Sequence, residues 1–184
     1  MRKLLIIPLV LSAVSVSEAS LIFTINGEPQ PDEITIVTSG NIELGVELAA
    51  GHTLRSFGFD YRLSNDQAEF LADNVVFKPA FDIPGSVLID DPQRVHVTGS
   101  MLFSPDLQGP ALLFEGLLVH CLGPVDVEMI VWNDETWIDG ELLIVTDPLS
   151  HLTIHQIPEP MTLALLSFGV LLLRRRKQPA RRTQ

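Results

Sequence analysis

Apolar and polar residues alternate along several short stretches in the middle of the chain, most clearly over residues 42–48, 57–63 and 125–131. A period of two with one apolar face is typical of a β-strand that packs on a core and has its other face in water. On this basis we predict about nine strands. They cover residues 21–25, 34–37, 42–48, 54–63, 69–77, 93–100, 111–120, 125–132 and 141–146, and the pattern allows a last strand at 151–155.

Turn-forming residues separate these stretches at short intervals, as in Ser39-Gly40-Asn41, Pro84-Gly85-Ser86 and Asp139-Gly140. Glycine, proline, asparagine and aspartate favour the backbone conformations that tight turns require. No stretch shows a convincing apolar stripe at helical spacing over 11 residues. Many short strands joined by turns predict an all-β fold, an antiparallel β-sandwich over residues 20–157.

The N-terminus is typical of a secretory signal peptide. Arg2 and Lys3 precede an apolar run from Leu4 to Val16, and the small residues Ser17 and Ala19 follow it. These are the three parts of a signal peptide, which we expect the secretion translocon to engage and a peptidase to cut between Ala19 and Ser20. The alternative is a buried first helix or strand, which Pro8 and the flanking charges disfavour.

The C-terminus has a second apolar run, residues 161–173, followed by the basic cluster Arg174, Arg175, Arg176 and Lys177. As a helix this run rises only about 20 Å, so it would span a hydrocarbon core of about 30 Å only if the bilayer thins or flanking residues snorkel. The basic cluster should stay cytoplasmic by the positive-inside rule. Residues 178–184 are then a cytoplasmic tail, and residues 20–157 lie outside the membrane.

Pro158, Glu159 and Pro160 stand directly before this run, and the three parts together resemble the PEP-CTERM sorting signal of exported bacterial proteins. The resemblance covers residues 157–177, and the tail of residues 178–184 is longer than expected for it. It implies cleavage at the tripeptide by an exosortase-type transpeptidase, after transient anchoring in the inner membrane. It also implies a final location in the cell envelope, on the outer surface or in the extracellular matrix. The alternative is a plain C-terminal membrane anchor.

Charge is distributed unevenly along the 184 residues, whose net charge is −11. Residues 20–157 hold 21 acidic residues against Arg55, Arg62, Lys78 and Arg94, a net charge of −17. Nucleic-acid binding needs lysine and arginine to neutralise phosphates, so nucleic acid is excluded as a partner. The hydrophobic fraction of 46% argues against disorder, and the length allows one ordinary domain. Because Cys121 is the single cysteine, an intramolecular disulfide is excluded.

A second resemblance concerns the predicted sandwich. Residues 57–66, 94–99 and 111–116 are similar to successive strands and turns of cohesin-like modules, in the same order and with similar spacing. The resemblance spans about residues 33–155 and rests on pattern rather than on invariant residues. It implies a nine-stranded jelly-roll sandwich related in fold to carbohydrate-binding modules. It supports the fold more than any particular partner.

Residue patterns that would indicate catalysis are absent from the sequence. It contains no H-E-x-x-H, G-x-S-x-G, P-loop or G-x-G-x-x-G motif. His151 and His155 would lie roughly 13 Å apart on one strand, too far to share a metal ion. His120 and Cys121 are neighbours and would point to opposite faces of a strand, so they do not form a nucleophile and base.

The acidic stretch of residues 133–140 holds the remaining candidates. Asn133, Asp134 and Asp139 crowd oxygen donors into a turn, as a calcium loop does, but without EF-hand spacing. The alternative is a plain acidic hairpin, and otherwise we expect no cofactor. Trp132 and Trp137 flank the hairpin and are candidates for stacking on sugar rings, against the alternative that they pack in the fold.

The sequence thus predicts a non-catalytic exported module that binds an extracellular protein or a polysaccharide through one sandwich face or a strand edge. A polysaccharide-binding module is the alternative within the same fold. An enzyme, such as a glycoside hydrolase that uses two carboxylates, is the alternative from another class. A small sandwich of 138 residues leaves little material for a substrate cleft, which disfavours it.

Overall fold

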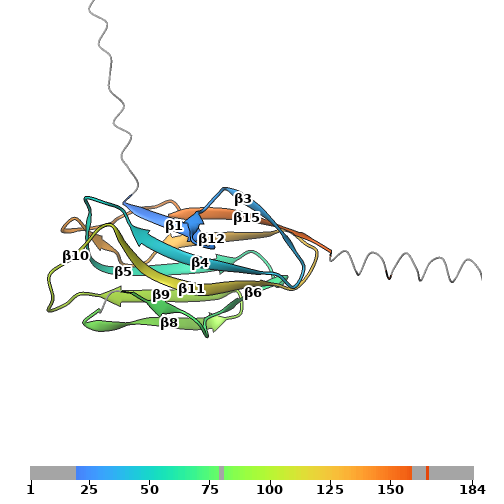
Figure 1. Ribbon diagram of the computed structural model, residues 1–184, viewed down its shortest axis with the longest axis horizontal. Coiled ribbons are helices and arrows are strands. Elements are labelled where there is room, and N and C mark those ends of the chain that lie inside the picture. Colours follow the sequence, from blue (N-terminus) through green and yellow to red (C-terminus); the bar gives the residue numbers. More distant parts are fainter. Residues whose placement is uncertain (1–19, 79–80, 159–164, 166–184) are drawn as a thin grey trace, which may run out of the picture.

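The computed structural model describes residues 20–78, 81–158 and 165. In this part of the chain, two β-sheets pack face to face (Figure 1). The smaller sheet has six strands, which run β2, β1, β4, β11 and β6, with β7 also paired to β11. Their bounds are Leu21–Ile25 (β1), Glu28–Pro29 (β2), Asn41–Leu48 (β4), Ala68–Leu71 (β6), Val76–Phe77 (β7) and Ala111–Cys121 (β11).

The larger sheet has nine strands arranged around β5. One edge of β5 pairs with β9 and β10, and β9 pairs in turn with β8; the other edge pairs with β12 and β13. Beyond β12 lie β15 and β3, and β14 lies beyond β13. The bounds are Glu33–Val37 (β3), Thr53–Leu63 (β5), Ile83–Asp91 (β8), Arg94–Ser100 (β9), Leu107–Gln108 (β10), Val127–Asn133 (β12), Trp137–Ile138 (β13), Glu141–Leu142 (β14) and Ser150–Ile157 (β15).

The predicted all-β sandwich is confirmed, and most predicted strands occur within two residues of their expected bounds. The allowed strand at 151–155 is real and longer, as β15. Strict antiparallel pairing was wrong at one place, because β15 runs parallel to β3. Strands that no short turn connects are free to align in either direction.

Three strand predictions need correction. The stretch 69–77 is two strands, β6 and β7, separated by a turn in which the Val75 amide donates to the Ala72 carbonyl at 3.3 Å. Only Glu141–Leu142 of 141–146 forms a strand. The predicted stretch 125–132 begins later, at Val127, which leaves Val125 exposed. The sequence pattern also missed the edge strand β8. Val87, Leu88 and Ile89 are consecutive apolar residues and show no alternation, and Leu88 and Ile89 are both exposed.

Aromatic side chains join the two sheets at the centre of the core. Phe57, Phe59 and Tyr61 come from the inner face of β5, and Phe114 comes from β11. The Phe114 ring centroid lies 6.0 Å from that of Phe57 and 6.5 Å from that of Tyr61. All four side chains are buried. Because large aromatic side chains bury much apolar area, these contacts contribute strongly to the stability of the sandwich.

A β-bulge in β11 directs Phe114 into the core. Leu113 and Phe114 are consecutive and both buried, although successive side chains of a regular strand point to opposite faces. The pairing of β11 with β4 shifts register on both sides of Phe114, between Leu112 and Phe114 and between Phe114 and Leu117. Gly116, with φ +86°, lies in the second shift, where a Cβ atom would meet the Asn74 carbonyl oxygen at 2.3 Å. This glycine is therefore required by both conformation and space.

We expect Phe114→Ala to lower the free energy of unfolding by about 3–5 kcal/mol, because it leaves a cavity between the sheets. Urea denaturation of the protein, followed by circular dichroism, measures this change. Phe103→Ala is the matched control, since the Phe103 side chain is 91% exposed and its removal should change stability by less than about 0.5 kcal/mol. Equal losses in the two variants would contradict this account of the core.

Candidate binding face

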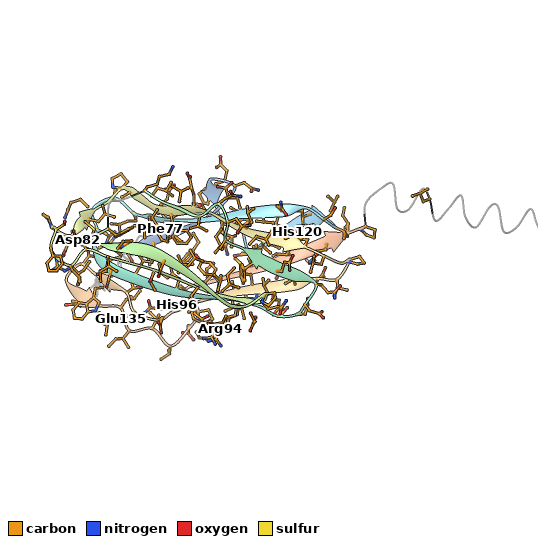
Figure 2. All side chains as sticks on the ribbon, turned by 90° about the horizontal axis from the view of Figure 1, so that it is seen from below. Phe77, Asp82, Arg94, His96, His120 and Glu135 are labelled. Carbon is orange, nitrogen blue, oxygen red and sulfur yellow. The ribbon has the colours of Figure 1, made fainter. Side chains whose placement is uncertain are left out.

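The outer face of the larger sheet collects the candidate functional side chains. Cross-strand register places Leu88 of β8, His96 of β9, Asp60 of β5 and Trp132 of β12 in one row. The neighbours of His96 and Asp60 along their strands are buried in the core, so this row faces outward. Figure 2 shows His96, Arg94 and Glu135 along the same side of the sandwich. We call this surface, formed by β8, β9, β5, β12 and β13, the outer face.

Asp60 is buried at the centre of the outer face, with only 6% of its surface exposed. Arg62 Nε donates to its Oδ2 at 2.9 Å, and Arg94 Nε donates to its Oδ1 at 2.9 Å. Burial by itself would raise the pKa of Asp60, but the hydrogen bonds from Arg94 and Arg62 outweigh it, and the pKa lies below its usual value. The carboxylate therefore stays ionised and holds both half-exposed guanidinium groups in place.

No local pattern in the sequence indicates this cluster. Asp60 occupies a polar position of an alternating strand, which normally faces water. The available signal was Arg62 two residues later on the same face, but the contribution of Arg94 depends on the pairing of β9 with β5. That pairing is a tertiary property.

A groove crosses the outer face beside this cluster. A second row of register partners runs from Ile83 through Ser100 and Ser56 to Trp137. The groove has a volume of about 570 Å³. Its lining combines apolar side chains, hydroxyl groups and charged groups: Arg55, Ser56, Phe57, Gly58, Ile83, His96, Thr98, Gly99, Ser100, Leu102, Asp134, Glu135 and Trp137.

The two tryptophans lie in different environments. Trp137 is 40% exposed and lines the groove. Trp132 is half-buried, stands opposite Asp60 in the first row, and is not among the groove residues. Only Trp137 therefore has the surroundings of a binding site.

The three candidate calcium ligands do not converge. Asn133 Nδ2 donates to the Leu143 carbonyl at 2.6 Å, and Asp134 Oδ2 lies 3.4 Å from His96 Nε2. Asp139 accepts a hydrogen bond from the Thr53 amide at 2.8 Å and contacts His52 Nδ1 at 2.6 Å. Across the described residues, no three histidine, cysteine, aspartate or glutamate side chains are grouped so that they could hold a metal ion.

His151 and His155 lie beside carboxylates, and Cys121 lies in the core. His151 lies 3.9 Å from Glu128, whereas His155 lies between Asp126 at 3.1 Å and Glu33 at 3.3 Å. Hydrogen bonds to Asp126 and Glu33 raise the pKa of His155. Cys121 is buried, and burial raises the pKa of its thiol. These surroundings do not favour a nucleophilic cysteine.

Most of the predicted sorting residues lie outside the described residues: Ala19, Glu159, Pro160 and the basic cluster 174–177. Ser20 precedes β1, and Pro158 directly follows β15. Among the residues that the structure describes, no helix is both long enough and apolar enough to cross a membrane.

Comparison with known proteins shows the fold of this sandwich. The fold is that of cohesin modules, and three solved structures are similar to it over nearly their whole length. A non-cellulosomal cohesin from the archaeon Archaeoglobus fulgidus has a TM-score of 0.52 and 11% identity, over 80% of this chain and 98% of its own. The sixth cohesin of Acetivibrio cellulolyticus scaffoldin B, in complex with a Cel5 dockerin, has a TM-score of 0.52 and 8% identity, over 75% and 99%.

The third, the OlpA cohesin of Clostridium thermocellum in complex with the dockerin Doc918, has a TM-score of 0.51 and 11% identity, over 75% of this chain and 99% of its own. Identities this low show a shared fold and leave function to the site itself. The cohesin-like β-sandwich predicted from the sequence is confirmed as a fold. No family model and no curated protein matches the sequence.

We expect Asp60→Asn to lower the free energy of unfolding by about 2 kcal/mol at pH 7, because both arginines lose their charged acceptor. The folded-state pKa is lowered, so this stabilisation is present above the unfolded pKa of about 3.9 and is lost as the pH falls through the folded value. Urea denaturation at several pH values should therefore show the two proteins converging below about pH 4. The exposed Glu141→Gln is the control. A gap that persists at low pH would contradict the ionic role of Asp60.

Proposed function

We propose that this protein is a non-catalytic exported module that binds an extracellular protein through the outer face. The observation that carries this proposal is the outer face itself. It presents Leu88, whose side chain is 59% exposed, opposite His96 of β9, and the half-exposed Arg94 two residues before His96 on the same strand. Arginine and exposed apolar side chains on a rigid surface are common anchors of protein interfaces. Two of the similar cohesin structures are complexes with dockerins, which supports a protein partner.

We further propose that the chain is exported by its signal peptide and sorted at Pro158-Glu159-Pro160 to the cell envelope or matrix. The described fold supports this order of parts, because its last strand, β15, ends at Ile157, immediately before the tripeptide. The Ile157 carbonyl accepts hydrogen bonds from the Thr38 amide at 2.8 Å and its hydroxyl at 3.0 Å. A transpeptidase cutting at the tripeptide would release a complete domain.

Polysaccharide binding is the second candidate function. It is favoured by the exposure of Trp137 in a groove that also holds hydroxyl and carboxylate groups. Pockets that bind small ligands combine an aromatic or apolar wall with a few placed polar groups.

Replacing Pro158, Glu159 and Pro160 by alanine should prevent cleavage in a host that has an exosortase. Mass spectrometry of the mature C-terminus should find the wild-type protein shortened at the tripeptide and the variant with its C-terminal region retained. Replacing Gln178 by alanine is a control that leaves the tripeptide unchanged. The same mature C-terminus in the wild type and the triple variant would refute the sorting proposal.

Leu88→Arg should weaken protein binding by about tenfold or more, because it places a large charged side chain on the outer face. The matched control is Val76→Arg, since Val76 is an exposed apolar residue of the smaller sheet. Chemical cross-linking of the three tagged proteins in their host, followed by mass spectrometry, compares them. We expect one protein to be cross-linked to the wild type and the Val76→Arg variant and to be depleted with Leu88→Arg. An identical set with all three, or none, would contradict the proposal.

A further inference from the structure

The floor of the groove is made of small side chains. Register pairs Ser56 of β5 with Ser100 of β9, and Gly58 with Thr98. The hydroxyl groups of Ser56, Thr98 and Ser100 therefore lie on the outward side of two adjacent strands. Their backbone groups take part in the ladders that join β5 to its neighbours, so the floor offers side-chain hydroxyls and no free strand edge.

One wall of the groove is the turn between β12 and β13, which is fastened to the floor. The Asp134 amide donates to the Gly58 carbonyl at 2.9 Å, and the Gly58 amide donates to Thr136 Oγ1 at 3.4 Å. A Cβ atom at position 58 would lie 3.2 Å from the Glu135 nitrogen, so glycine allows the close approach of the turn. Trp137 follows this turn, and its position beside the floor is fixed by its pairing with Ser56.

The opposite wall contains Ile83 and Leu102, both exposed. The loop that follows β9 is held by Asp82, which accepts hydrogen bonds from the Phe103 amide at 2.6 Å and the Ser104 amide at 2.7 Å. Arg55 holds the same loop through Asp106 at 2.8 Å. Both walls are thus fixed by hydrogen bonds before any ligand arrives, which lowers the entropic cost of binding.

The chemistry of the lining selects the class of ligand. An indole ring beside hydroxyl and carboxylate groups matches a pyranose ring, which has apolar C–H faces and a rim of hydroxyl groups. Arg55 is the one arginine or lysine among the described lining residues, and its guanidinium already pairs with Asp106. With a net charge of −17 over residues 20–157, the domain repels uronic acids and sulfated sugars. An extended peptide finds no open backbone edge on this floor.

We propose that the groove beside Trp137 is a binding site for an uncharged polysaccharide, with Trp137 stacking on a sugar ring and Ser56, Thr98 and Ser100 bonding its hydroxyl groups. This site deepens the second candidate function. It adjoins the Leu88 row of the outer face that we assign to a protein partner, and His96 belongs to both. The protein would then bind a glycan and a protein at neighbouring sites, as a link in a surface matrix.

The test uses the mature exported protein and titration calorimetry with hexasaccharides of four uncharged series: cello-, manno-, xylo- and laminari-oligosaccharides. Hexagalacturonate is the anionic comparison, and a hexapeptide of alternating lysine and threonine is the peptide comparison. We expect at least one uncharged hexasaccharide to bind, and Trp137→Ala to weaken its affinity by about tenfold or more. Trp132→Phe, the matched control outside the groove, should keep the affinity within about twofold.

In the Trp132→Phe background, Trp137 is the sole tryptophan, so its fluorescence should change on addition of the same sugar. The proposal is overturned if no uncharged hexasaccharide binds, if Trp137→Ala binds as well as the wild type, or if hexagalacturonate or the peptide binds more tightly. Leu88→Arg should retain the sugar affinity. Because the protein partner is detected by cross-linking, failure of sugar binding and failure of protein binding are separate results.

Discussion

Contact between the aromatic side chains of β5 and Phe114 of β11 is the interaction on which the rest of the structure depends. It joins the two sheets through buried rings whose centroids lie 6.0–6.5 Å apart. Side chains of a strand alternate between the two faces of the sheet. Because Phe57, Phe59 and Tyr61 are buried, the intervening residues of β5 face outward. A register slip of one residue would expose three aromatic side chains, which makes the orientation of β5 strongly specified.

The outer face is a direct consequence of that orientation. Ser56, Gly58, Asp60 and Arg62 are the residues that β5 turns away from the core. The first two form part of the groove floor, and the last two form the charged cluster with Arg94. One strand therefore contributes residues to both neighbouring sites, and its packing on Phe114 fixes the direction in which these residues face. Sites placed on paired strands are held more rigidly than sites on loops.

Charge has a structural role as well as a role in partner choice. Each of the four basic residues of the domain pairs with a carboxylate: Arg55 with Asp106, Arg62 and Arg94 with Asp60, and Lys78 with Glu115. The cations are thus largely neutralised within the fold, and the surplus of carboxylates determines the long-range field. This distribution favours partners that are uncharged or basic, which agrees with the proposed sugar site and with a protein partner.

The sequence by itself determined the class of fold and the inner faces of the main strands. Alternation in 42–48 and 57–63 is a local pattern, and the burial of these apolar positions follows from it directly. The strongly acidic character of the domain was equally readable. The signals at both ends remain predictions, because their defining residues lie largely outside the described part of the chain.

Only the tertiary structure decided which outward residues meet. Ile83, Ser100, Ser56 and Trp137 are separated along the chain, and they share a row because β8, β9, β5 and β13 pair in one register. The hydrogen bond from Arg94 to Asp60 and the parallel pairing of β15 with β3 likewise depend on how the strands pair. The sequence pattern indicates which residues of a strand face outward, but not which outward residues of different strands lie side by side. Cross-strand register decides this, and it is set by packing of the inner faces, which no local pattern contains.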